Sequence, residues 1–207
     1  MRRVFTTLLA ATLLLTLTAP AAFAATPVTG KVIMLDAGHG GYDPGAVNPY
    51  NSVAEKWINL AIVHRLKEKL EEDGAIVQVT RIGDIFVGLA QRAAIANAAR
   101  PDVFVSIHHN STGNPVTNGT ETYYTHAGSR GLAESLNFFI VKNMGTANRG
   151  VKQRGLAVTR LTRVPAVLTE ASFITSNAES SAFIYLDRVE QETIGLQQGL
   201  LNYFAHH

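Results

Sequence analysis

Three apolar runs of the sequence end in side chains that can bind a metal ion or move a proton. The run 31–35 leads into His39 within DAGHGG, the run 102–107 leads into His108, and the run 165–169 leads into Glu170. Glycines on both sides of His39 permit a sharp turn and keep bulky side chains away from a bound ion. Reactive groups of open α/β sheets collect just past the carboxyl ends of strands. We therefore expect these three side chains to meet at one sheet edge.

Glu55 supplies a carboxylate from the start of a predicted helix. It lies 16 residues after His39 and 53 residues before His108. These separations exclude a helical HExxH site, whose two histidines are one turn apart, and require a site built from three segments. Two imidazoles and one carboxylate, with the fourth position open to water, are the ligand set of a hydrolytic zinc site. The chain has no cysteine, so disulfides, thiolate metal sites and cysteine nucleophiles are excluded.

Glu170 is the candidate general base. Water activated by a metal needs a group that takes its proton and passes it to the leaving nitrogen, and a carboxylate suffices when the metal lowers the pKa of the water. Each residue also has a plainer interpretation. A histidine at a strand end can be a hydrogen-bonded structural residue, Glu55 can be a favourable first-turn acid of a helix, and Glu170 can be a salt-bridge partner.

Strand-like runs alternate with helical patterns along the chain. This alternation predicts an α/β fold: a single domain with a mostly parallel twisted sheet, helices on both faces and the zinc site at the carboxyl ends of strands. The expected strands are 31–35, 75–80, 102–107 and 121–125. The expected helices are 54–73, 87–99, 130–144, 178–186 and 189–204, and short apolar runs at 156–158 and 166–169 bracket a turn near Pro165.

The first 24 residues read as a signal peptide. Arg2 and Arg3 precede an apolar stretch from Leu8 to Leu17, and Ala22-Phe23-Ala24 places small residues where a signal peptidase cuts. An uncleaved membrane anchor is the alternative. We expect a catalytic domain over residues 25–207, with its core at about 31–204, exported to the periplasm or the extracellular cell wall and without stable membrane insertion after cleavage. Without the two arginines, 16 basic residues balance 16 acidic ones, so no nucleic-acid partner is expected.

Seven motifs occur in an order that resembles a known family. They are DAGHGGYDPGA, EKWINLA, VTRIGDIFVGLAQRAAIAN, VFVSIHHN, GTETYY, NRGVK and PAVLTEASFITSN, and they cover most of residues 31–204. The chain resembles the zinc-dependent N-acetylmuramoyl-L-alanine amidases, the bacterial cell-wall amidases of the division and spore lytic type. The resemblance implies Zn²⁺ held by His39, Glu55 and His108. It also implies Glu170 as the catalytic carboxylate and peptidoglycan as the substrate, cut between N-acetylmuramic acid and L-alanine.

Two other functions stay open at this stage. One is a zinc peptidase that cuts within the peptidoglycan stem peptide, and the other is a non-catalytic wall-binding module. His109 stands where the family more often has a small residue, so the third ligand is a choice between His108 and His109, and we assign His108. Asn110 and Arg92 are candidate substrate contacts, with a structural ion pair as the alternative for Arg92.

The loop after Asn110 is too short for the helix that occludes the zinc in some family members. We therefore expect a constitutively open site. The chain shows no wall-binding repeats, so a targeting or activator protein is a possible partner, and we expect a monomer.

Overall fold

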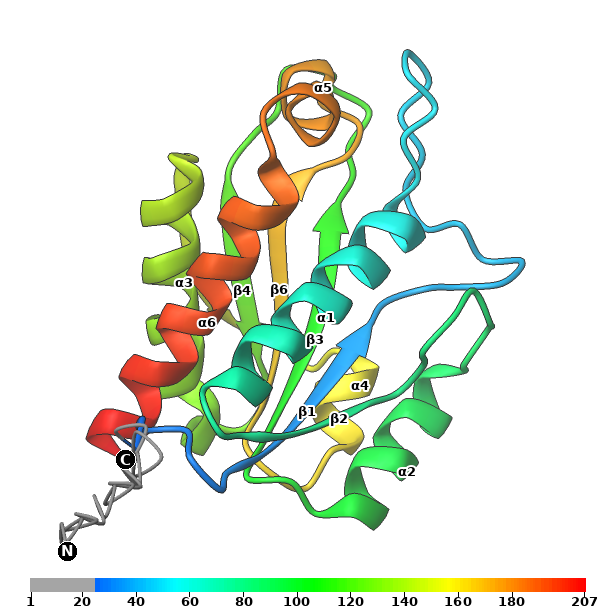
Figure 1. Cartoon of the computed structure of the whole chain (residues 1–207). Helices are drawn as coiled ribbons and strands as arrows, with labels where there is room; N and C mark the ends of the chain where they lie inside the picture. The colour runs from blue at the N-terminus through cyan, green and yellow to red at the C-terminus, as the bar shows by residue number, and fades with distance from the viewer. Residues whose placement is uncertain (1–24) are drawn as a thin grey trace, which may run out of the picture.

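Six strands form one twisted sheet in the order β2-β1-β3-β6-β4-β5 (Figure 1). The computed structural model describes residues 25–207. The strands are β1 (Val32–Ala37), β2 (Ile76–Val79), β3 (Val103–Asn110), β4 (Thr120–Tyr124), β5 (Asn148–Gln153) and β6 (Ala166–Phe173). Strands β2, β1, β3 and β6 are parallel, β4 runs antiparallel to β6, and β5 is parallel to β4. The expected mostly parallel sheet is confirmed.

Helices cover both faces of the sheet, as predicted. One face carries α1 (Glu55–Glu72), α3 (Arg130–Met144) and α6 (Arg188–His206), while α2 (Leu89–Ala99) and α4 (Ala157–Leu161) cover the other (Figure 1). Helix α5 (Asn177–Tyr185) follows β6, and a single 3-10 turn (Ala127–Ser129) precedes α3. No helix within residues 25–207 combines the length and the hydropathy needed to cross a lipid bilayer.

The central strands are buried on both faces, which explains their continuous apolar runs. Ile33 and Leu35 of β1 belong to the larger core beneath α1, α3 and α6. Met34 and Phe104 point the other way, into a smaller core beneath α2 and α4. Because β1 and β3 are fixed between two helix layers, the turns at their carboxyl ends have a rigid base.

Most predicted elements agree with the structure to within a few residues. The exceptions are β5, which has no counterpart among the expected strands, and the run 156–158, which lies at the start of α4. Strand β5 has the sequence NRGVKQ, with one strongly apolar residue. It is the last strand of the sheet, and no further strand of the described residues pairs with its outer edge, so polar side chains are expected there. The predicted signal peptide, 1–24, lies outside the described residues.

Candidate metal centre and active site

His39 lies in a tight turn two residues after the end of β1. Its backbone is in the left-handed region, with φ +60°, a conformation that is uncommon for residues other than glycine. The ring Nδ1 lies 2.8 Å from Oδ2 of Asp43, and Nε2 lies 3.1 Å from Oε2 of Glu55. A proton on Nδ1 that is shared with Asp43 leaves Nε2 free to act as a ligand.

Glu55 is the first residue of α1 and is almost fully buried. Backbone N–H groups donate to both of its oxygens: Ala46 to Oε2 at 2.9 Å and His109 to Oε1 at 3.0 Å. The Asn59 side chain, one helical turn later, also donates to Oε1 at 3.2 Å. Burial alone would raise the pKa of Glu55, but hydrogen bonds and charge from His108 and His39 outweigh it and hold that pKa well below its usual value.

His108 lies near the end of β3 and completes the cluster. Its Nδ1 is 2.9 Å from Oε1 of Glu55, and its ring meets that of His39 edge to face, with centroids 4.9 Å apart. Only glycine fits at position 38, because a Cβ there would come within 2.2 Å of the His108 ring. The potential ligand atoms of His39, Glu55 and His108 lie within 4.8 Å of one another.

The donor set of this cluster fits a zinc ion. Two imidazole nitrogens and one carboxylate oxygen come from three separate segments, and one side of the cluster faces an open cleft. Within residues 25–207 it is the one group of three or more such side chains that are close enough to share an ion. The structure thus brings together the three residues that the sequence predicts as ligands.

Glu170 lies on β6 directly beside His108, its partner in the register between β3 and β6. Its Oε2 is shielded from solvent and has no hydrogen-bond partner. Burial, followed by the charges of Glu55, Glu121 and Glu192, raises the pKa of Glu170 well above its usual value. A half-buried carboxyl that lines a cleft, with its inner oxygen shielded and unpartnered, is suited to exchange protons with a bound molecule.

One cleft of about 410 Å³ contains Glu170 together with the three potential ligands His39, Glu55 and His108, which we call the metal cluster because they could hold an ion. Its walls come from the turns after β1 and β3, the start of α1 and the middle of β6. The lining residues are His39, Asp43, Gly45, Ala46, Glu55, His108, His109, Asn110, Ser111 and Glu170. Water, a metal ion and a carbonyl group can therefore meet within reach of a proton acceptor.

His109 points to the opposite side of β3 and is buried. Its Nδ1 lies 2.8 Å from Oδ1 of Asn59, and its Nε2 lies 2.9 Å from Oε2 of Glu192 on α6. Burial alone would lower the pKa of His109, but the Glu192 carboxylate outweighs burial and raises it. Strand alternation therefore brings His108, not His109, to the metal cluster.

Arg92 and Asn110 were predicted to contact the substrate. Arg92 is only 2% exposed and forms an ion pair with Asp36 at 2.7 Å. Its guanidinium also donates to the backbone oxygens of Ala37 and His39, so it braces the turn that carries His39. Asn110 lines the cleft and donates to Glu121 at 2.7 Å. The ion-pair alternative for Arg92 is what the structure shows, and a substrate contact of either residue stays a prediction.

Glu121 is a site residue that sequence reasoning missed. It lies on β4 opposite Glu170, and its buried carboxylate accepts hydrogen bonds from Asn110, Tyr123, Arg149 and Lys152. Burial alone would raise the pKa of Glu121, but these partners, Lys152 first among them, hold it below its usual value. Alternation within ETYY places Glu121 and Tyr123 on the same side of a strand, but the local sequence does not show that β4 pairs with β6 and so brings Glu121 opposite Glu170.

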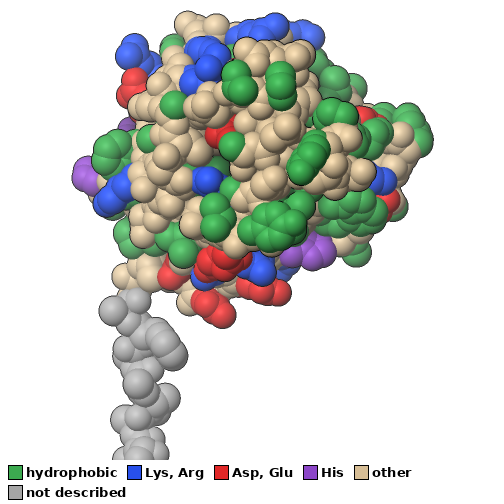
Figure 2. All heavy atoms as spheres, turned by 90° about the horizontal axis from the view of Figure 1, so that it is seen from above, with side chains coloured by type: hydrophobic (Ala, Val, Ile, Leu, Met, Phe, Trp, Pro, Cys, Tyr) green, Lys and Arg blue, Asp and Glu red, His purple; other side chains and the backbone are tan. Residues whose placement is uncertain are grey.

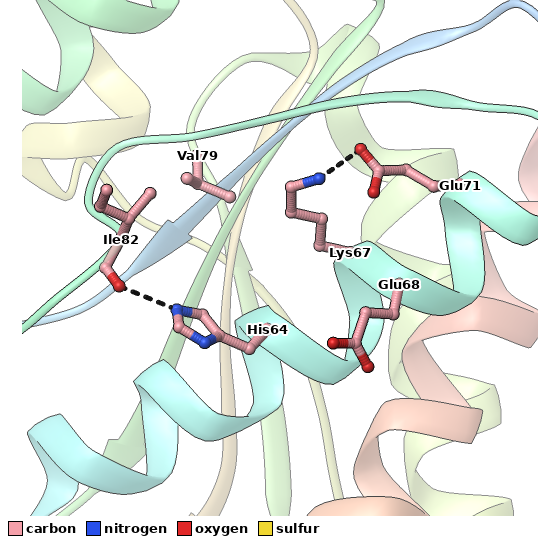
Figure 3. Close-up of a pocket in the computed structure, with 6 residues that line it drawn as sticks. All are labelled: His64, Lys67, Glu68, Glu71, Val79 and Ile82. Carbon is pink, nitrogen blue, oxygen red and sulfur yellow. Dashed lines mark hydrogen bonds and ion pairs between the residues drawn. The ribbon is translucent and has the colours of Figure 1, made fainter.

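A second cavity lies on the outer side of α1 near β2 (Figure 3). It contains no group of potential metal ligands like that of His39, Glu55 and His108. It is lined by His64, Lys67, Glu68, Glu71, Val79 and Ile82. His64 lies 3.0 Å from the backbone oxygen of Ile82, and Lys67 pairs with Glu71. His64 is held by a backbone oxygen and Lys67 by Glu71, and no buried, unpartnered carboxyl oxygen comparable to that of Glu170 lines this cavity.

The fold and the site together define an α/β domain whose parallel strands carry, at their carboxyl ends, a His-Glu-His group that could hold a metal ion. Comparison with known proteins then identifies the family: residues 33–197 match N-acetylmuramoyl-L-alanine amidase, and the chain belongs to this family. It is therefore a member of this class of enzymes.

Individual relatives agree with the family match. The chain is 38% identical to the uncharacterized protein YqiI of Bacillus subtilis over 99% of both chains. It is 36% identical to the N-acetylmuramoyl-L-alanine amidase LytC of Bacillus subtilis, over 86% of this chain but only 36% of LytC. The crystal structure of an N-acetylmuramoyl-L-alanine amidase from Clostridium difficile 630 superposes with a TM-score of 0.82 at 33% identity, over 86% of this chain and 98% of the other.

Proposed function

We propose that this protein is a zinc-dependent hydrolase that cuts the amide between N-acetylmuramic acid and L-alanine in peptidoglycan. One observation carries the proposal: His39, Glu55 and His108 converge on a cleft that also contains the unpartnered carboxyl of Glu170. Family membership supports the choice of bond.

His39, Glu55 and His108 would hold the zinc ion. When bound, zinc acts as a Lewis acid towards the scissile carbonyl and makes a nearby water more acidic. The surrounding chain keeps the ligands in place: Asp43 orients the His39 ring, Asn59 and two backbone N–H groups fix the Glu55 carboxylate, and Gly38 leaves room for the His108 ring.

Glu170 moves the proton. As a carboxylate it takes a proton from the water that attacks the carbonyl carbon, and the new C–O bond forms as the carbonyl π bond opens. The protonated Glu170 then gives that proton to the nitrogen of L-alanine, and the carbonyl π bond re-forms as the C–N bond breaks and the amine leaves. Burial raises the pKa of Glu170 in the metal-free site. A divalent cation held by His39, Glu55 and His108 would lower that pKa and so allow the carboxylate to act as a base.

The test is mass spectrometry of the products released from purified peptidoglycan, with and without a chelator. We expect stem peptides that begin with a free L-alanine amine, and no release after chelation. New amines inside the stem would instead identify the peptidase alternative. Bound zinc without any new amine would indicate a wall-binding module and overturn the proposal.

The proposed place of action is the cell wall, reached by export through the predicted signal peptide at residues 1–24. The segment 111–119, between β3 and β4, contains no helix, and the cleft is open to solvent. We therefore propose that the domain acts without an activator. A purified mature protein that cleaves only after a partner is added would contradict this.

A further inference from the structure

An exposed aromatic pair stands beside the metal cluster. Tyr42 and Phe86 stack with centroids 4.3 Å apart and an interplanar angle of 26°, and they are 80% and 42% exposed. Tyr42 lies three residues after His39, in the same turn. The nearby Ile85 and Leu89 are also exposed. We call the Tyr42–Phe86 pair the aromatic step.

The aromatic step rests on two loops that are locked together. The Gly41 N–H donates to Asp84 at 2.8 Å, and Lys56 bridges the Gly41 backbone oxygen and the Asp84 carboxylate, both at 2.8 Å. At Gly40, a Cβ would lie 2.3 Å from the backbone oxygen of Ile85. The backbone that carries the two rings is therefore held in place before any ligand arrives, which lowers the entropic cost of binding to them.

A cleft of about 290 Å³ is shared by Phe86 of the aromatic step and by His39 and His108 of the metal cluster. It is lined by His39, Asp43, Phe86, Val87, Leu89, Arg92 and His108. Two predicted zinc ligands and Phe86 thus line the same cleft. A substrate whose carbonyl lies at the metal cluster has room to extend one of its two halves along this cleft.

The charges in this cleft favour a neutral occupant. Its one cation, Arg92, is buried and paired with Asp36, and Asp43 and Asp84 are the nearby carboxylates. Apart from the zinc ion that the proposed function places at His39 and His108, an anionic stem peptide would meet no unpaired positive charge along this cleft. A sugar has an apolar C–H face that covers an aromatic ring, and hydroxyl groups that donate to carboxylates.

The opposite side of the site has the charge that a stem peptide needs. The edge strand β5 carries Arg149 and Lys152, which share the single carboxylate of Glu121, and exposed Arg154 follows it. In the sheet, β5 lies on the far side of β3 and β6 from β1. On this end of the molecule, Figure 2 shows Lys and Arg gathered mainly along the top edge and hydrophobic side chains mainly over the right half.

We propose that the aromatic step is the saccharide subsite: the N-acetylmuramic acid ring stacks on Tyr42 and Phe86, and the stem peptide extends towards β5. This assignment rests on the proposed function, since it places the two halves of that substrate on either side of the scissile amide.

The experiment compares two substrates, one with and one without the sugar, in the wild type and in variants that lack one of the two aromatic rings. Zinc-loaded wild type, Tyr42→Ala and Phe86→Ala are assayed on a muropeptide and on the same peptide carrying a lactoyl group in place of the muramoyl sugar. We expect each variant to lower kcat/KM on the muropeptide roughly tenfold and to change the lactoyl peptide less than about twofold. Tyr42→Phe should restore the muropeptide rate, because it keeps the ring. Tyr185→Ala, which removes an equally exposed ring on α5, is the matched control.

A binding measurement separates this proposal from the proposed function. The probe is the stem-free oligosaccharide of N-acetylglucosamine and N-acetylmuramic acid, titrated into the holoenzyme and followed by NMR. Tyr42→Ala should weaken its binding severalfold even if no substrate is cut. Equal losses on both substrates, or unchanged oligosaccharide binding, would overturn the saccharide subsite. Failure of the wild type to cleave either substrate would instead count against the proposed function.

Discussion

At the scale of single residues, the predicted ligands were recoverable because each follows or begins a strongly patterned element. His39 and His108 end apolar runs, and Glu55 opens a helix. The environments of His109 and Glu121 were not recoverable in this way. His109 depends on Glu192 of the last helix, and Glu121 faces Glu170 only because β4 pairs antiparallel with β6. Such non-local pairings leave no trace in local spacing.

The role of Glu170 can be tested by an isosteric change. Glu170→Gln keeps the shape of the side chain but cannot accept a proton, so stem release should fall by roughly 10²–10⁴-fold. Zinc content by mass spectrometry should remain one ion per chain, since Glu170 lies outside the His39–Glu55–His108 cluster. Near-normal turnover, or loss of zinc, would show that the role is assigned wrongly.

The raised pKa of Glu170 also predicts how stability depends on pH. In the folded, zinc-free protein this carboxyl keeps its proton above 4.5, the ordinary value at which an unfolded glutamate loses it. The folded state then binds more protons than the unfolded state, so the contribution of Glu170 to stability is greatest at low pH and falls as pH rises. The melting temperature of Glu170→Gln relative to wild type, measured in chelator, should therefore increase from pH 4 to pH 8. A constant difference would contradict the raised pKa.

At the scale of elements, α1, α3 and α6 cover one face of the sheet, and α3 and α6 pack against each other. Helices α3 and α6 approach closely because α6 presents glycine at 195 and 199. A Cβ on Gly195 would lie 2.8 Å from Cα of Ile140, a backbone atom that cannot move cheaply. The amphipathic pattern made both helices predictable. The short edge strand β5 was not, because its stability comes from pairing with β4 and not from burial of its own side chains.

Replacement of Gly195 by alanine tests that close approach. Alanine would gain about 0.5–1 kcal/mol of helix propensity, but the clash with the α3 backbone should cost more. We expect a net loss of about 1–3 kcal/mol in the free energy of unfolding by urea. Gly113→Ala, in a loop with no atom within 4 Å of the added Cβ, is the control and should change stability by less than about 0.5 kcal/mol. A neutral Gly195→Ala would show that the helices are less tightly packed.

At the scale of the whole molecule, the metal cluster ties together three segments that are distant in the chain: the turn after β1, the start of α1 and the end of β3. A ligand that binds only the folded state stabilises it by mass action, by about 2.7 kcal/mol when its free concentration is a hundred times Kd. Zinc should therefore raise the melting temperature of the mature protein by roughly 5–10 °C over the chelated form. His108→Ala should abolish this shift.

The control for His108→Ala is the same substitution at a histidine that lies outside the metal cluster. His126 is exposed and its ring lies 3.3 Å from the backbone oxygen of Arg160, so His126→Ala should keep the full zinc-dependent shift. The comparison separates specific binding by the cluster from general binding of zinc to surface imidazoles, which would also stabilise His108→Ala. Because unfolding of a small domain is cooperative, a shift that depends on His108 would mean that one ion at the sheet edge stabilises both helix layers. An equal shift in all three proteins would place the zinc elsewhere and remove the basis for the proposed hydrolysis.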